Sequence, residues 1–107
     1  MSADSTSGDV LVFFPGFVVP SGGYSELLQP LADQGVVVHV PTLYRPTPRV
    51  LLGRFSVTDE AREAAAYVET NVPLNARLFL GGHSRGGQVA WRAAKLVIRS
   101  GRPVAGL

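Results

Sequence analysis

Gly81-Gly82-His83-Ser84-Arg85-Gly86-Gly87 is the stretch around which the rest of the sequence is organised. An apolar run, residues 78–80, precedes it, and a segment with apolar residues at helical spacing begins near Gln88. An apolar run that ends in glycines and continues into a helical pattern predicts a strand, a tight turn and a helix. Ser84 lies at the turn of this unit.

The spacing Gly82-X-Ser84-X-Gly86 predicts a nucleophile elbow. At such a turn the chain bends so sharply that the serine side chain is exposed, and small neighbours let the strand and the helix come close. Gly82 and Gly86 are those small neighbours. The N–H groups at the start of the following helix favour negative charge, which suits an oxyanion that develops beside Ser84. The alternative is an ordinary β-α turn whose serine caps a helix.

Length and composition fit a single domain with a hydrophobic core. The chain has 107 residues, of which 46% are hydrophobic, and its net charge of +2 is too small to indicate a nucleic acid or an anionic membrane as partner. The absence of cysteine excludes disulfides and thiolate metal sites. No apolar run reaches the length of a membrane span.

Residues 1–9 are polar and small, which predicts a disordered leader before an ordered segment, residues 10–107. The leader has neither a basic patch nor an apolar stretch, so no secretory signal is visible. This favours a cytoplasmic protein, but a leader already removed would leave no trace, so the compartment stays unknown.

Four apolar runs predict strands that are buried on both faces, as in parallel sheets. The segments between them carry apolar residues at helical spacing. The predicted strands are 10–14, 36–40, 76–80 and 104–107, and the predicted helices are 24–34, 58–72 and 87–100. This alternation predicts an α/β fold with a parallel sheet of about four strands flanked by helices. The fourth run ends with the sequence, so we expect a truncated domain.

Two of the predicted helices carry local signals. Pro30 predicts a kink or a break in the first, which Gly35 ends. Thr58 predicts an N-cap for the second helix. Asp59 and Glu60 follow in its first turn, where the macrodipole favours negative charge, so a structural role for both acids is favoured over a catalytic one.

His39 and the segment 41–57 leave alternatives open. His39 occupies an alternate position on the second predicted strand, where a packed histidine is favoured over a catalytic base. The segment 41–57 contains three prolines, and it is either a long loop lining a binding cleft or a surface excursion.

Three motifs together carry a family resemblance. Gly82-His83-Ser84-Arg85-Gly86-Gly87 follows Val12-Phe13-Phe14-Pro15-Gly16-Phe17 and Tyr24-Ser25-Glu26-Leu27-Leu28. Over residues 10–107 the sequence resembles the N-terminal part of an α/β-hydrolase, and within that superfamily chlorophyllases and their bacterial relatives. Its Pro-Gly-Phe loop differs from the His-Gly-Phe of chlorophyllases and is similar to the Pro-Gly-aromatic loop of cutinase-like polyester hydrolases. This difference concerns the substrate rather than the reaction.

The resemblance implies a serine carboxylic-ester hydrolase that acts on a small-molecule ester through an acyl-serine intermediate, with no metal or cofactor. It implies Ser84 as the nucleophile, with an oxyanion hole from the backbone N–H groups of Phe17 and Arg85. It also implies that the first strand lies between the second and the third, so that the segments following the first and third strands meet at the site.

The acid and the histidine of a triad are missing after the nucleophile. The family places them there, yet no Asp, Glu or His follows Ser84. The ring of His83 is expected to point away from Ser84, so it is not taken as the base. We expect an intact parent that is an esterase, and a 107-residue chain that is nearly inactive alone and able to associate through open sheet edges. The alternative is a short, non-catalytic α/β module that binds a small acyl ligand or a complementing partner chain.

Overall fold

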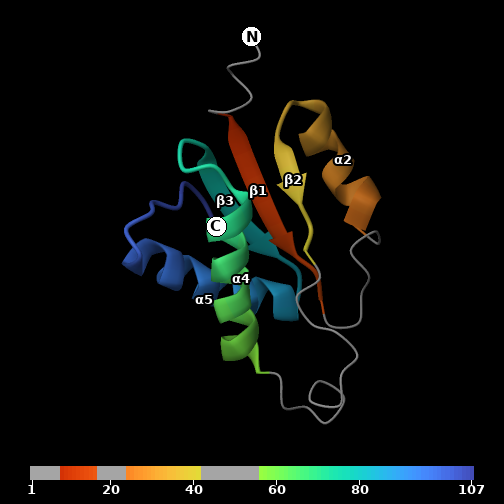
Figure 1. Ribbon diagram of the computed structural model, residues 1–107. Helices are drawn as coiled ribbons and strands as arrows, with labels where there is room; N and C mark the ends of the chain where they lie inside the picture. Colours follow the sequence, from red (N-terminus) through yellow and green to blue (C-terminus); the bar gives the residue numbers. More distant parts are fainter. Residues whose placement is uncertain (1–7, 17–23, 42–55) are drawn as a thin grey trace.

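A parallel sheet lies at the centre of the computed structural model, which describes residues 8–16, 24–41 and 56–107 (Figure 1). Strands and helices alternate along the chain, as the apolar runs predict. In order they are β1 (Asp9–Phe14), α2 (Ser25–Asp33), β2 (Val37–His39), α4 (Val57–Asn71), β3 (Arg77–Gly82) and α5 (Arg85–Arg99). The predicted α/β class is confirmed.

β1 is the central strand of the sheet. The strand order is β2-β1-β3, and both pairings are parallel. This is the order that the family resemblance implies. Because Phe14 is opposite Gly82 in the register, β1 and β3 end side by side, and the segments that follow them leave from the same end of the sheet.

The fourth predicted strand is reduced to a single bridge. Gly106 pairs with Phe79 in an isolated parallel bridge along the outer side of β3. The N–H of Ala105 donates to the Leu78 carbonyl at 2.7 Å, and the N–H of Leu80 donates to the Gly106 carbonyl at 3.1 Å. The sheet therefore has three strands instead of about four. Pro103, which directly precedes this run, has no N–H to donate to a ladder with β3.

The hydrophobic core lies between the sheet and the helices α4 and α5 (Figure 1). Alternate residues of β1 point into it, and Phe14 is fully buried there. The core consists of Val10, Val12, Phe14, Leu78 and Leu80 from the strands, Ala61, Ala64, Val68 and Val72 from α4 and its end, and Val89, Ala90, Ala93, Ala94 and Val97 from α5. This packing holds the start of α5 against the end of β1.

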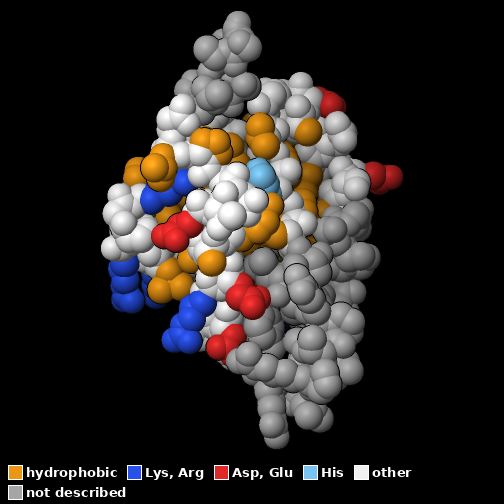
Figure 2. All heavy atoms as spheres, viewed as in Figure 1, with side chains coloured by type: hydrophobic (Ala, Val, Ile, Leu, Met, Phe, Trp, Pro, Cys, Tyr) orange, Lys and Arg blue, Asp and Glu red, His pale blue; other side chains and the backbone are white. Residues whose placement is uncertain are grey.

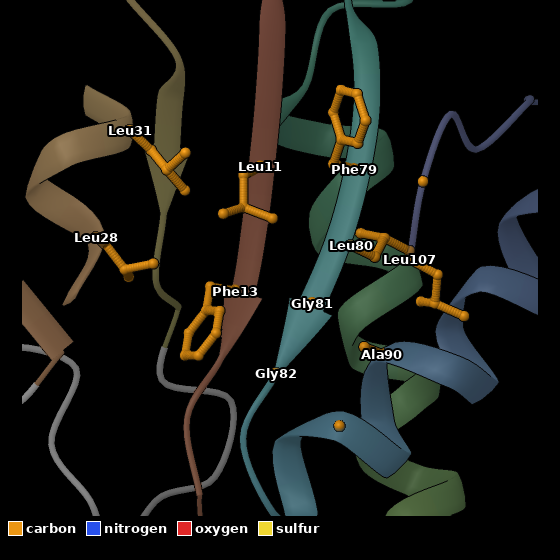
Figure 3. Close-up of a pocket in the computed structure, with 12 residues that line it drawn as sticks. Leu11, Phe13, Leu28, Leu31, Phe79, Leu80, Gly81, Gly82, Ala90 and Leu107 are labelled. Carbon is orange, nitrogen blue, oxygen red and sulfur yellow. The ribbon is translucent and has the colours of Figure 1, made fainter. Parts of the chain in front are cut away.

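The opposite face of the sheet is only partly covered, so the prediction that the strands are buried on both faces is wrong: buried and half-buried residues alternate along β1, and Val37 of β2 is exposed. α2 packs against β2, and its side chains Leu28 and Leu31 face Leu11 and Phe13 of β1 across an open apolar hollow (Figure 3). The hollow has a volume of about 610 Å³ and extends past Phe79 toward the end of the chain. Association through the sheet edges stays a prediction.

The helices differ from the predictions in two places. α4 is capped by Ser56 instead of Thr58: the Ser56 hydroxyl accepts from the N–H of Asp59 at 3.1 Å, and the Asp59 carboxylate accepts from the N–H of Ser56 at 3.3 Å. This reciprocal capping box starts the helix at Val57 and places Thr58 inside its first turn. α2 continues through Pro30 without a break, because this exposed proline removes only one N–H from the helix.

Ordered structure at the start of the chain includes Asp9, one residue earlier than predicted. The Arg77 guanidinium donates to both oxygens of the Asp9 carboxylate, at 2.7 and 2.9 Å, and this lowers the pKa of the carboxyl group. Residues 1–7 of the predicted leader lie outside the described residues. So do residues 42–55, which make up most of the segment for which two interpretations were open.

Metal clusters and membrane-spanning helices are both absent from the described part of the chain. It contains no group of three or more His, Cys, Asp or Glu residues that could hold a metal ion. None of its helices is long and apolar enough to cross a membrane. On the face shown in Figure 2, basic and acidic side chains are interspersed rather than gathered into a patch of one sign.

Candidate active site

Ser84 lies at the tip of the turn between β3 and α5, where it is exposed. Its backbone angles are φ 57° and ψ −120°, and among the described residues no other non-glycine has a positive φ. Such a conformation costs a residue with a Cβ atom about 1–3 kcal/mol. Hydrogen bonds on both sides hold the turn: the N–H of Gly86 donates to the His83 carbonyl at 2.9 Å, and the N–H of Gly87 donates to the Ser84 carbonyl at 3.0 Å.

Gly82 and Gly86 allow three segments of backbone to approach closely. A Cβ atom on Gly82 would collide with the carbonyl group of Gly86 and would lie 2.7 Å from the nitrogen of Gly87. A Cβ atom on Gly86 would collide with the carbonyl group of Phe14 and would lie 2.7 Å from the carbonyl oxygen of Pro15. These are backbone atoms, which cannot move aside as the end of a side chain could. Both positions therefore require glycine for steric reasons, independently of any catalytic role.

The end of β1 is joined to the elbow by hydrogen bonds. The N–H of His83 donates to the Phe14 carbonyl at 3.2 Å. Tyr24, the residue that precedes α2, accepts a hydrogen bond from the N–H of Gly16 at 2.9 Å, and its hydroxyl oxygen lies 3.2 Å from Nδ1 of His83. The end of β1 and Tyr24, eight residues after Gly16, thus meet the elbow, which lies 59 residues further along the chain at His83.

An ion pair joins the start of α5 to the first turn of α4. Nε of Arg85 donates to Oε1 of Glu60 at 3.0 Å, and Glu60 is only 2% exposed. Burial raises the pKa of Glu60, while the hydrogen bond and the charge of Arg85 oppose that rise. Glu60 thus has a structural role, as its position predicts, but the role extends beyond its own helix to the residue that follows Ser84.

Four of the five predicted site residues lie in one turn: Ser84, Arg85, Gly82 and Gly86. Phe17, the fifth, lies outside the described residues. The described chain before it ends at buried residues, Pro15 and Gly16.

Both histidines of the sequence have a tyrosine hydroxyl at Nδ1. His83 faces Tyr24, as described above, and His39 at the end of β2 lies 2.7 Å from the hydroxyl of Tyr67 on α4. The contact of His39 agrees with a packed histidine. Nδ1 of each ring is directed at a tyrosine rather than at Ser84.

Sequence reasoning missed the part that Tyr24 takes in this site. The helical spacing around α2 places Tyr24 among apolar residues, and it is buried as predicted. The available signal was its hydroxyl group, because a buried tyrosine usually requires a hydrogen-bond partner. That signal indicates that a partner exists without indicating which residue it is.

Comparison with known proteins identifies the family. The sequence pattern of the Alpha/beta hydrolase family matches residues 11–107. The chain belongs to this family. No curated protein matches the sequence of this Alpha/beta hydrolase family member.

Two solved structures are similar to this Alpha/beta hydrolase chain. One is YbtT, a type II thioesterase from the yersiniabactin NRPS/PKS biosynthetic pathway, with a TM-score of 0.66 and 28% identity over 92% of this chain and 40% of that chain. The other is RedJ, a thioesterase from the prodiginine biosynthetic pathway in Streptomyces coelicolor, with a TM-score of 0.67 and 24% identity over 92% of this chain and 39% of that chain. The chain thus spans about two fifths of these thioesterases. Membership of the superfamily is confirmed, and the likeness to chlorophyllases or cutinases stays a prediction.

Proposed function

We propose that Ser84 is the nucleophile of a serine hydrolase that cleaves an acyl ester or thioester through an acyl-serine intermediate. The observation that carries the proposal is the backbone of Ser84, which is held at φ 57° on an exposed turn between a buried strand and a helix. Strain of this kind concentrates at functional sites. A serine that served only as a helix cap would not need it, and the Ser84 side chain makes no capping hydrogen bond to α5.

The start of α5 supports the stabilisation of negative charge. Arg85 is the first residue of this 15-residue helix, whose N-terminal end favours an anion. In the proposed reaction, Oγ of Ser84 attacks the acyl carbonyl carbon, and the oxyanion accepts hydrogen bonds from the backbone N–H groups of Arg85 and Phe17. The bond from the acyl carbon to the leaving oxygen or sulfur then breaks, and the leaving group takes up the proton that Ser84 lost and departs as an alcohol or thiol. Water hydrolyses the acyl-serine, which releases the carboxylic acid and returns a proton to Oγ of Ser84.

Two observations support different leaving groups. The motifs around Phe17 and Ser84 resemble those of chlorophyllases and polyester hydrolases, which favours an oxygen ester. YbtT, at 28% identity, is a type II thioesterase, which favours an acyl thioester. Both substrates give the same acyl-serine, so the choice is one of substrate recognition rather than of mechanism.

The proposal concerns the complete gene product. The chain spans about 40% of YbtT, and neither of its histidines presents Nδ1 to Ser84. A serine without a base keeps only the contribution of the oxyanion hole and of binding, roughly 10³- to 10⁴-fold over water. We therefore expect the 107 residues alone to react slowly with acyl substrates.

A fluorophosphonate probe tests the assignment of Ser84. The complete gene product is expected to be labelled at Ser84, as located by peptide mass spectrometry, and the Ser84→Ala variant is not. Ser100→Ala is a matched control, because Ser100 lies at the other end of α5 and its hydroxyl donates to the carbonyl of Val97. Equal labelling of the wild type and Ser84→Ala would reject the assignment.

The leaving group is tested with one acyl chain presented in two forms. A p-nitrophenyl ester and an N-acetylcysteamine thioester of the same acid are compared by kcat/KM. Preference for the thioester supports a thioesterase, and preference for the ester supports an esterase. A folded protein that neither labels nor turns over either compound would support the alternative of a non-catalytic module.

A further inference from the structure

We infer that Tyr24 is a positioning residue whose single hydroxyl group holds Gly16, which follows β1, in place beside His83 of the nucleophile elbow. The inference rests on the proposed function, because it concerns the residues next to Ser84 and next to the predicted oxyanion donor Phe17. Gly16 immediately precedes Phe17, and His83 immediately precedes Ser84. The Tyr24 hydroxyl contacts both preceding residues.

The ring of Tyr24 is held in place before its hydroxyl makes any hydrogen bond. Tyr24 is 8% exposed, and its ring packs edge to face against Phe13 with 4.9 Å between the centroids. Its backbone is the N-cap of α2, so the helix constrains it from the other side. A hydroxyl on such a ring offers the backbone N–H of Gly16 an acceptor at a fixed position.

The hydrogen bonds around the hydroxyl form a directed chain. The oxygen of Tyr24 accepts from the N–H of Gly16 at 2.9 Å, which leaves the hydroxyl proton for a second bond. Nδ1 of His83, at 3.2 Å, accepts that proton when the imidazole is neutral and protonated on Nε2. The hydroxyl thus acts as acceptor and donor at once, and consecutive hydrogen bonds of this kind strengthen one another.

The elbow has a second link to β1. The bond from the N–H of His83 to the Phe14 carbonyl holds the elbow whether or not the hydroxyl is present. Removing the Tyr24 hydroxyl is therefore expected to weaken the hold on Gly16, the neighbour of the predicted oxyanion donor, while the elbow keeps its backbone. A misplacement of about 1 Å in a reacting group can cost about 100-fold in rate. Because Gly16 keeps its other contacts, we expect a smaller effect, about tenfold.

Tyr24→Phe is the test, because it keeps the ring and its packing against Phe13 and removes only the hydroxyl. Tyr67→Phe is the matched control: it removes another tyrosine–histidine hydrogen bond, of 2.7 Å, within the packing of β2 and α4. Both variants are made in the complete gene product, with folding monitored by circular dichroism. The rate constant of fluorophosphonate labelling at Ser84, kcat and KM for the p-nitrophenyl ester, and the hydrogen exchange rate of the Gly16 amide are measured in each.

In Tyr24→Phe we expect labelling and kcat to fall about tenfold, with KM changed less than about twofold, and the Gly16 amide to exchange about tenfold faster. Tyr67→Phe should change none of these. The inference is overturned if Tyr24→Phe labels Ser84 at the wild-type rate, if Gly16 exchange does not change, or if Tyr67→Phe slows labelling equally. A wild-type protein that is not labelled at Ser84 would reject the proposed function, and this inference with it. A wild-type protein that is labelled, together with a Tyr24→Phe variant that reacts at the same rate, would reject the inference alone.

Discussion

Arg85→Ala removes the partner of a buried carboxylate and gives a prediction whose size follows from the structure. Glu60 is 2% exposed, and its hydrogen-bonded partner Arg85 has a side chain that is 22% exposed. Breaking a fully buried pair costs about 3–5 kcal/mol, because the remaining charge stays buried without compensation. Since water reaches Arg85, we expect the lower end, about 3 kcal/mol of unfolding free energy at pH 8.

The loss is expected to depend on pH. Burial already raises the pKa of Glu60, and Arg85→Ala raises it further, because the hydrogen bond and the charge that oppose burial are gone. A carboxyl group whose folded-state pKa is raised contributes stability below its unfolded pKa, and this contribution is lost as pH rises through the folded pKa. As pH falls toward 5, Glu60 in the variant takes up a proton more readily than an ordinary carboxyl group, so the loss is expected to shrink toward about 1 kcal/mol, the contribution of the hydrogen bond alone.

Urea unfolding followed by circular dichroism at pH 5 and pH 8 measures both values. Glu60→Gln keeps an oxygen acceptor for Arg85 without the buried charge, so it should cost about 1 kcal/mol or less and show no added pH dependence. Arg77→Ala is the matched control, because it breaks an exposed ion pair with Asp9. The pKa of Asp9 is lowered, so its contribution is constant between these pH values. Equal losses for Arg85→Ala at pH 5 and pH 8 would refute the reasoning.

Two further predictions concern the elbow. Gly86→Ala places a methyl group against the backbone carbonyl of Phe14 and should cost at least about 3 kcal/mol of unfolding free energy. The matched Gly87→Ala, whose Cβ would have no neighbour closer than 3.6 Å, should stabilise the helix by about 0.5–1 kcal/mol. Thermal unfolding compares the two variants, and similar midpoint temperatures would contradict the steric argument. Ser84→Gly should be about 1 kcal/mol more stable than Ser84→Ala, because glycine adopts a positive φ without strain. A Ser84→Ala variant that equals or exceeds Ser84→Gly in stability would show that the turn stores no strain.

The sequence by itself determined the chain of local elements and the centre of the site. The strands are visible as apolar runs, and the elbow is visible as a spacing of Ser84 between Gly82 and Gly86, because both depend on residues that are neighbours along the chain. The runs did not reveal that one face of the strands is only partly covered, because that depends on where the helices pack. The steric need for the two glycines agrees with the predicted close approach of strand and helix. The start of α4 was predicted only to within two residues, since Ser56 and Thr58 are both acceptable caps and only the reciprocal bond to Asp59 distinguishes them.

The tertiary structure alone decided which distant residues support that centre. Glu60 and Arg85 are 25 residues apart, and Tyr24 and His83 are 59 residues apart. No local pattern encodes such pairs, because each depends on how α4 and α2 lie against the sheet. The same reason explains the fourth apolar run: its composition predicts a strand, but only its placement beside β3 decides that a single bridge forms. The type of a side chain thus determines which hydrogen bonds and ion pairs it can make, and the packing of the helices against the sheet determines the residue with which it makes them.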